Sequence, residues 1–165
     1  MAEVIILCGK VAAGKTTYAK QLARSLPSVI LSIDDLVVSL RDHCEGPRQL
    51  RELEGKIRAY DGSLAKQLVP QGITCIIDHG HWTRDSRQQI IDACRAGGLP
   101  YRLVWLTCPR GIRLQRLKQR NEQVRSSGEK GYVIDAEQLE RFDSWFEELS
   151  EEERMHAEIL ETGNS

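Results

Sequence analysis

Four short apolar runs alternate along the chain with longer segments in which apolar residues recur every three or four positions. The runs cover residues 4–7, 29–33, 73–77 and 101–106, and several of their residues are β-branched. Apolar runs of this length predict strands that are buried on both faces of a parallel sheet. Residues 155–161 fit either a short strand or a frayed helix end, and we favour a fifth strand.

The periodic segments between the runs predict helices, and capping residues mark where two of them begin. Thr83 is a predicted N-cap, and Asp135 with Gln138 forms a predicted capping box. The predicted helices cover about residues 18–26, 36–40, 50–68, 84–96, 109–125 and 139–149. The acidic stretch 147–153 is expected to be a solvated surface. Alternating strands and helices predict one α/β domain over residues 1–165, a three-layer sandwich with a four- or five-stranded parallel sheet.

The segment between the first predicted strand and the first predicted helix reads Gly-Lys-Val-Ala-Ala-Gly-Lys-Thr-Thr over residues 9–17. It matches Gly-x-x-x-x-Gly-Lys-Ser/Thr, the phosphate-binding P-loop, in the strand–loop–helix context that this motif requires. The fold class is therefore predicted to be a P-loop NTPase fold. Lys15 is expected to contact the β- and γ-phosphates of ATP, and the Thr16 hydroxyl to bind Mg²⁺. The predicted nucleotide-binding residues of the loop are Gly9, Ala12, Ala13, Gly14, Lys15, Thr16 and Thr17.

Polar residues also follow the second and third predicted strands. Asp34 and Asp35 come after the second strand, and Asp78, His79 and His81 come at the end of the third. Ligands of a parallel α/β sheet bind at the carboxyl ends of its strands, so these residues and the P-loop are expected to converge on one active site.

Asp34 is the predicted general base, because a kinase needs a carboxylate that accepts the proton of the acceptor hydroxyl. The alternative for Asp34 is a helix cap, while Asp35 suits the first turn of a helix. Asp78 is predicted to reach the Mg²⁺ shell through water, and its alternative is a turn or cap residue. His79 and His81 alternate at a strand end and are expected to point apart, which argues against a metal pair.

The predicted helix that starts at residue 109 is rich in arginine. At 100° per residue, Arg113, Arg116 and Arg120 fall within an arc of about 60°. Arginines on a closing lid can neutralise the charge that develops on the γ-phosphate, although a solvated basic face is the alternative. The polar, glycine-flanked residues 126–131 predict a mobile loop, so we expect a lid over about residues 110–131.

Composition narrows the function further. The formal net charge of −1 gives no global field that attracts nucleic acid or anionic lipid. The five cysteines form no Cys-x-x-Cys pair, which argues against a zinc site and a disulfide framework. There is no run of 18 apolar residues, and a strand follows directly after residue 3. We therefore expect no signal peptide, no membrane partner and a cytoplasmic location.

Four segments together resemble a group of P-loop kinases known as zeta-toxin-like or AAA_33. They are residues 9–16, 32–36, 76–84 and 116–121, and the similarity extends over roughly residues 3–150. The group includes polynucleotide 5′-kinases, chloramphenicol phosphotransferase and zeta toxins. The resemblance implies that Asp34 is the base, that Arg120 contacts the phosphates from the lid, and that Arg125 lies near the adenine.

The polynucleotide kinases of this group carry an arginine three positions after the base, where this chain has Val37. We therefore expect an ATP-dependent kinase that uses Mg²⁺ and transfers the γ-phosphoryl group to a hydroxyl of a small molecule. A polynucleotide 5′-hydroxyl kinase and a non-catalytic nucleotide-sensing protein are the alternatives. A GTPase is not expected, because the chain lacks both the Asn-Lys-x-Asp and the Asp-x-x-Gly patterns. The predicted catalytic residues are Lys15, Asp34, Arg116 and Arg120.

Overall fold

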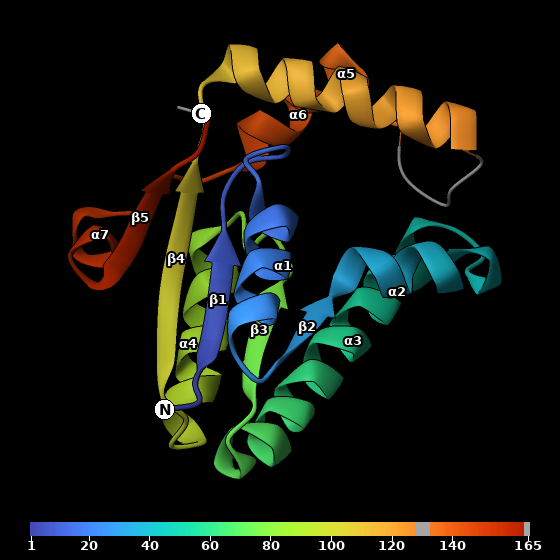
Figure 1. Cartoon of the computed structure of the whole chain (residues 1–165). Coiled ribbons are helices and arrows are strands. Elements are labelled where there is room, and N and C mark those ends of the chain that lie inside the picture. Colours follow the sequence, from blue (N-terminus) through green and yellow to red (C-terminus); the bar gives the residue numbers. More distant parts are fainter. Residues whose placement is uncertain (128–132, 164–165) are drawn as a thin grey trace.

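A computed structural model describes residues 1–127 and 133–163 of the chain. Five parallel strands form a sheet in the order β2-β3-β1-β4-β5 (Figure 1). The strands are β1 (Val4–Cys8), β2 (Ser28–Ser32), β3 (Thr74–Asp78), β4 (Tyr101–Thr107) and β5 (Ala157–Glu161). The predicted parallel sheet is confirmed, and the fifth strand that we favoured is present.

Helices connect successive strands and agree well with the predicted segments. They are α1 (Lys15–Ser25), α2 (Ile33–Leu40), α3 (Pro47–Leu68), α4 (Arg84–Ala96), α5 (Arg110–Ser127), α6 (Ala136–Trp145) and α7 (Glu151–His156), with 3-10 helices at Arg41–His43 and Val69–Gln71. Thr83 caps α4 by accepting a hydrogen bond from the backbone N–H of Ser86. Asp135 and Gln138 form the capping box of α6, as predicted.

Both faces of the sheet are covered, so successive residues of one strand pack into different apolar clusters. Val4 and Ile6 of β1 belong to the cluster that includes Ala65 of α3 and Ile91 of α4. Ile5 of β1 belongs to the cluster on the other face, with Ala19 of α1. Figure 1 shows α1 in front of the sheet and α4 behind it. This three-layer arrangement explains why the strand sequences are continuously apolar and do not alternate.

The boundary between β2 and α2 differs from the prediction. β2 ends at Ser32 and α2 begins at Ile33, so Asp34 lies in the first turn of a helix and does not continue the strand. The Ser32 hydroxyl accepts a hydrogen bond from the backbone N–H of Asp35 at 3.4 Å. This contact satisfies one of the N–H groups that an α-helix leaves without a partner at its start.

The segment after α6 is packed against the sheet without being helical. α6 ends at Trp145, whereas the apolar spacing predicted a helix to residue 149. Phe146 and Leu149 are nevertheless buried, and the ring centroid of Phe146 lies 6.4 Å from that of Trp105 in β4. The spacing therefore identified buried positions correctly but assigned them the wrong backbone conformation.

The acidic stretch 147–153 is not simply solvated surface, because Glu153 pairs with a fully buried arginine. Arg87 has no exposed surface, and its guanidinium donates to both carboxylate oxygens of Glu153, at 2.7 and 3.1 Å. Nη1 of Arg87 also donates to the carbonyl oxygens of Trp82 and Glu147. Burial raises the pKa of Glu153, but the hydrogen bonds from Arg87 and Ser150 and the charge of Arg87 together outweigh burial and lower it below its ordinary value.

α5 lies across the carboxyl end of the sheet, above the loop that joins β1 to α1 (Figure 1). The predicted mobile loop 126–131 falls outside the described residues, apart from Ser126 and Ser127, which belong to α5. Within the described part of the chain, no helix is both long enough and apolar enough to cross a membrane.

Candidate active site

The loop between β1 and α1 has the backbone conformation that a phosphate-binding loop requires. Gly9, Ala12 and Gly14 have φ angles of 147°, 61° and 97°. A Cβ atom at Gly9 would lie 2.4 Å from the carbonyl oxygen of Leu106, so only glycine allows this close approach to β4. Since α1 starts at Lys15, the first N–H groups of the helix border the loop and favour an anion there.

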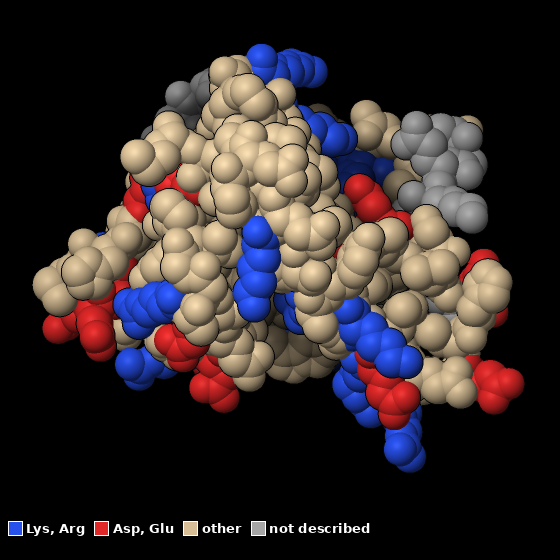
Figure 2. All heavy atoms as spheres, turned by 90° about the horizontal axis from the view of Figure 1, so that it is seen from below, with Lys and Arg blue, Asp and Glu red and all other residues tan. Residues whose placement is uncertain are grey.

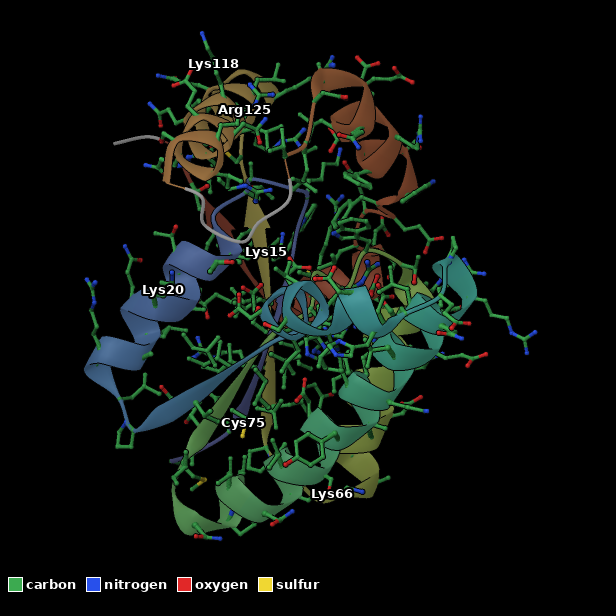
Figure 3. All side chains as sticks on the ribbon, turned by 90° about the vertical axis from the view of Figure 1, so that its right-hand side faces the viewer. Lys15, Lys20, Lys66, Cys75, Lys118 and Arg125 are labelled. Atoms are coloured by element: carbon green, nitrogen blue, oxygen red, sulfur yellow. The ribbon has the colours of Figure 1, made fainter. Side chains whose placement is uncertain are left out.

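Lys15 is held at the loop by backbone carbonyl groups. Its ammonium donates to the carbonyl oxygens of Gly9 and Lys10 at 2.9 and 3.0 Å. Burial lowers the pKa of Lys15, whereas the negative charges of Asp78 and Asp34 raise it. The ammonium therefore lies within electrostatic range of two carboxylates, and Figure 3 shows Lys15 between α5 and α2.

Thr16 and Asp78 form a second pair of groups beside the loop. The Thr16 hydroxyl donates to Oδ2 of Asp78 at 2.6 Å, and Asp78 is only 6% exposed at the end of β3. Hydroxyl and carboxylate oxygens are the ligands that Mg²⁺ prefers, so this donor set fits the ion. Among the described residues, no three His, Cys, Asp or Glu side chains cluster as a metal site. A Mg²⁺ ion held by one or two protein oxygens normally completes its shell with phosphate and water.

Asp34 lies on the P-loop side of α2. Burial and then the charge of Asp78 raise the pKa of Asp34, while Lys15 and Arg120 lower it. Much of the Asp34 side chain remains exposed, so solvent weakens these interactions. Asp35 is also exposed, and its backbone N–H is used in the contact with Ser32. Asp34 thus lies within electrostatic range of Lys15 and Asp78.

Arg113 does not present its charge to a ligand, contrary to the predicted basic arc on α5. It is 3% exposed, and its guanidinium donates to both carboxylate oxygens of Asp143 in α6, at 2.8 and 2.6 Å. Nη1 also lies 3.3 Å from the carbonyl oxygen of Val11 in the P-loop. The helical spacing placed Arg113 on the correct side of α5, but it could not show that α6 supplies a partner there.

Arg116 contacts the P-loop from above. Its Nη1 donates to the Thr162 hydroxyl at 3.0 Å and lies 3.5 Å from the carbonyl oxygen of Ala12. The Thr162 hydroxyl in turn donates to the carbonyl oxygen of Ala13 at 2.7 Å. No sequence motif marks Thr162; it reaches the loop because β5 joins the edge of the sheet next to β4.

The two remaining predicted arginines of α5 differ in their surroundings. Arg120 is close enough to Asp34 to lower its pKa. Arg125 lines a cavity of about 370 Å³ on the side of α5 that faces Ile134 and Asp135. Figure 3 shows Arg125 high on α5, above Lys15. The structure therefore brings Arg120 towards the loop, whereas Arg125 belongs to a separate hollow.

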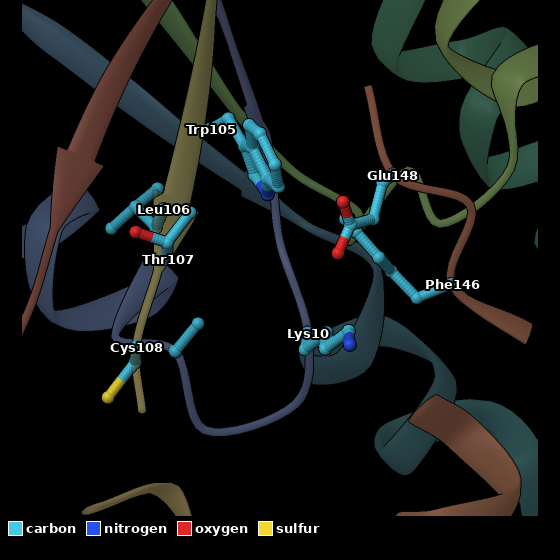
Figure 4. Close-up of a pocket in the computed structure, with 8 residues that line it drawn as sticks. Lys10, Trp105, Leu106, Thr107, Cys108, Phe146 and Glu148 are labelled. Carbon is cyan, nitrogen blue, oxygen red and sulfur yellow. The ribbon is translucent and has the colours of Figure 1, made fainter. Parts of the chain in front are cut away.

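A smaller cavity of about 140 Å³ lies beside the P-loop (Figure 4). Lys10 and Ala13 contribute the loop side of its wall, and Trp105 and Phe146 form much of the rest. The ammonium of Lys10 lies 5.8 Å from the centroid of the Phe146 ring, a cation–π contact. Lys15, Thr16, Asp34 and Asp78 do not line this cavity, so it is distinct from the place where the phosphates are expected.

His79 and His81 do not point apart as predicted. β3 ends at Asp78, and Gly80 and His81 have φ angles of 80° and 43°, so strand geometry does not continue. As a result, the two imidazole ring centroids lie 5.6 Å apart. Nε2 of His79 is 2.7 Å from a carboxylate oxygen of Asp61, a residue of α3 that is 2% exposed. No sequence motif marks Asp61.

The phosphate-binding loop follows β1, the central strand of the parallel sheet, and the carboxylate of Asp78 ends the neighbouring strand β3. This combination defines a P-loop nucleotide-binding protein. Residues 4–149 match the AAA_33 family, described as an AAA domain, and the chain belongs to this family. The resemblance found in the sequence is therefore confirmed. None of the curated proteins compared with the chain matches it.

Solved structures with the same fold include proteins of several functions. Kti12 from Chaetomium thermophilum in complex with ADP-AlF3 has a TM-score of 0.68 at 17% identity, covering 98% of this chain and 90% of its own. A gluconokinase from Sinorhizobium meliloti 1021 has a TM-score of 0.55 at 12% identity, with 99% and 84% covered. A chain of the Pnkp1/Rnl/Hen1 RNA repair complex has a TM-score of 0.68 at 20% identity, with 87% and 43% covered. The TM-scores show that these proteins share the fold of this chain, and at identities this low they show the fold alone.

Proposed function

We propose that this protein is an ATP-dependent kinase that transfers the γ-phosphoryl group of ATP to a hydroxyl group of a small molecule. The observation that carries the proposal is the proximity of Asp34 to both Lys15 and Asp78. A protein that only binds nucleotide has no need of a second carboxylate on the acceptor side of the P-loop. The gluconokinase and sugar kinase folds are consistent with this reaction class.

In the proposed reaction, the acceptor hydroxyl oxygen attacks the γ-phosphorus of ATP. The bond between that phosphorus and the β,γ-bridging oxygen breaks, and ADP leaves. The hydroxyl proton passes to the carboxylate of Asp34, whose pKa is raised by burial and by Asp78. A raised pKa makes Asp34 a better proton acceptor at the moment of transfer.

The remaining residues position the phosphates and offset their charge. Lys15 and the loop N–H groups hold the β- and γ-phosphates, and Arg120 approaches from α5. Thr16 and Asp78 would hold Mg²⁺, which neutralises charge on the phosphate oxygens when it is bound. Arg116 acts chiefly by holding the P-loop in position, because its Nη1 donates to the carbonyl oxygen of Ala12 and to the Thr162 hydroxyl.

Transfer to a polynucleotide 5′-hydroxyl is the second candidate, favoured by the fold shared with the RNA repair complex. Against it, Val37 stands where polynucleotide kinases of the group carry an arginine. Figure 2 shows the opposite face of the molecule, away from the P-loop, where basic and acidic side chains are interspersed. We therefore propose the small-molecule acceptor first.

The decisive test compares Asp34→Asn with Asp35→Asn. Loss of a general base is expected to slow phosphoryl transfer by roughly 10²–10⁴-fold in Asp34→Asn, with ATP affinity little changed. Asp35→Asn is the matched control, and it should retain transfer while losing about 0.3–1 kcal/mol of stability, because a negative charge is removed from the first turn of α2. Rates are measured as ADP formation with a panel of hydroxyl compounds. Equal rates in the two variants would remove Asp34 as the base.

Nucleotide binding is tested separately with Lys15→Ala. The loop N–H groups cannot replace the charge of the ammonium, so ATP affinity or turnover should be lost. The fold should be retained, because Lys15 bonds only to carbonyl groups of its own loop. Unchanged binding in calorimetry would contradict the assigned role of the P-loop.

A further inference from the structure

One face of α3 lies against the ends of β2 and β3, beside Asp34. Ile57 of α3 packs with Ile33 of α2, the residue that precedes Asp34. Asp61 of α3 bonds to His79 just after β3. Arg58 stands between these two residues, three positions before Asp61, and therefore shares the face of the helix that Asp61 presents to the sheet. Figure 1 shows α3 running beside α2 and β3.

The Nη1 atom of Arg58 is buried without a hydrogen-bond acceptor among the described residues. Burial lowers the pKa of Arg58, and the charges of Glu54, Asp34 and Asp61 raise it without any of them pairing with Nη1. A buried guanidinium nitrogen without an acceptor is costly, and such groups in native proteins call for an explanation.

His81 is a second buried group without a partner. It is 4% exposed, and both ring nitrogens are shielded and without a hydrogen bond among the described residues. Burial, then the neighbouring His79 and Arg58, lower the pKa of His81 to about 3, so the ring is neutral. The backbone of Ser86 acts in the opposite direction, but its geometry does not make it a partner of either nitrogen. A neutral imidazole offers one donor and one acceptor.

We propose that Arg58 and His81 form an acceptor subsite that binds an anionic group, so that the acceptor is a small hydroxyl compound carrying a carboxylate or a phosphate. The proposal rests on the proposed kinase function and narrows its substrate class. A planar guanidinium binds either anion through two parallel hydrogen bonds. The neutral imidazole suits a neighbouring hydroxyl, which can both donate and accept. Asp34, within electrostatic range of Arg58, then receives the proton of the hydroxyl that reacts.

His79 and Asp61 serve as the support of this subsite. Their 2.7 Å contact links α3 to the end of β3, and the His79 ring stands 5.6 Å from that of His81. Because Asp61 already has this partner, its charge does not satisfy Arg58. Arg58 therefore keeps a shielded nitrogen without an acceptor among the described residues, within electrostatic range of both Asp34 and His81.

The test uses matched pairs of acceptors that differ in charge. ADP formation is measured with neutral polyols, with the corresponding hydroxy acids and phosphate monoesters, and with a 5′-hydroxyl oligonucleotide. The intact protein should prefer the small anionic compounds. Arg58→Met should raise KM for them at least tenfold with a smaller change in kcat, while leaving any neutral acceptor unaffected. Arg51→Met, an exposed arginine of the same helix, is the control and should behave as the intact protein.

Each contrary result has a distinct meaning. Preference for neutral polyols, with no effect of Arg58→Met, overturns the anionic subsite and leaves the kinase proposal standing. Phosphorylation of the oligonucleotide alone overturns the small-molecule class.

If no hydroxyl compound is phosphorylated, the kinase proposal fails, and the subsite is judged by binding alone. The His81 ring resonances are followed by NMR while the hydroxy acids of the panel are added to the ADP-loaded protein. Saturable shifts that disappear in Arg58→Met support the subsite. Unchanged resonances with every acid overturn it.

Discussion

Three arginines in the described part of the chain have guanidinium nitrogens that are shielded from solvent, and they differ in whether a carboxylate is bonded to the guanidinium. Arg87 donates to both carboxylate oxygens of Glu153 and to backbone carbonyl oxygens. Arg113 donates to both carboxylate oxygens of Asp143 and to the carbonyl oxygen of Val11, although its Nε is buried without a partner among the described residues. Arg58 also has a buried nitrogen without a partner, and no carboxylate of the described residues is bonded to its guanidinium. The first two join segments of the chain that are distant in sequence, whereas Arg58 adjoins the carboxylate that we propose as the catalytic base.

The presence or absence of a paired carboxylate distinguishes arginines that stabilise the fold from an arginine that is available to bind a ligand. A buried charge that is paired with a carboxylate is part of the fold, and removing one partner leaves the other uncompensated. A buried donor without an acceptor reduces stability until something binds it, so it is expected where a ligand supplies the missing acceptor. Substitutions at these arginines and at His81 should therefore differ in their effect on stability.

Arg87→Met should destabilise the protein by about 3–5 kcal/mol, because it leaves Glu153 and the carbonyl groups of Trp82 and Glu147 without their shared donor. The measurement is the free energy of unfolding from urea denaturation. Arg84→Met provides the control, since Arg84 is exposed at the start of the same helix. If Arg87→Met lowers the free energy of unfolding by less than about 1 kcal/mol, then pairing with a buried carboxylate does not identify an arginine that stabilises the fold.

His81 should make stability depend on pH. The pKa of His81 is about 3 in the folded protein, against the ordinary value of 6.5. Between these values the unfolded chain binds a proton that the folded chain does not. The free energy of unfolding should therefore fall as the pH drops from about 6.5 towards 3, by up to about 1.4 kcal/mol per pH unit.

The control for this prediction is His81→Asn, because asparagine tolerates the positive φ angle at this position. Urea denaturation at pH 7, 6, 5 and 4 should give a shallower pH dependence in the variant than in the intact protein. Parallel curves would show that the ring is not buried in its neutral form.

Arg58→Met should change the free energy of unfolding by less than about 1 kcal/mol, with stabilisation the expected sign. The methionine retains the apolar stem and removes the nitrogen that has no acceptor. If Arg58→Met lowers the free energy of unfolding by several kcal/mol, as expected for Arg87→Met, then Arg58 stabilises the fold and is not a ligand-binding arginine.

Much of the fold was predictable because its signals are local. The apolar runs, the caps at Thr83 and Asp135, and the loop with Lys15 and Thr16 each depend on residues close together in sequence. The apolar spacing even identified Phe146 and Leu149 as buried, although the chain there is not helical. Local patterns of this kind determine which faces are apolar before tertiary contacts form.

The partners of polar side chains were not predictable in the same way. Arg113 appeared to be one of three available arginines, and its pairing with Asp143 depends on where α6 packs. The two histidines were expected to diverge, and their actual approach results from two successive left-handed residues after β3. Asp61 and Thr162 carry no motif, since their roles arise only when α3 and β5 reach the sheet. Contacts between distant segments are thus where sequence reasoning was least informative.

Thr162 also has a consequence for the order in which the chain folds. Its hydroxyl bonds to Ala13 across a separation of 149 residues, and Arg116 joins the same group. During synthesis, the P-loop residues are made well before Thr162, so these contacts wait until 149 further residues have been added after Ala13. Closing so long a loop of chain is entropically costly and comes late. A nascent chain would thus carry the phosphate-binding sequence well before that loop reaches its final hydrogen-bonded form.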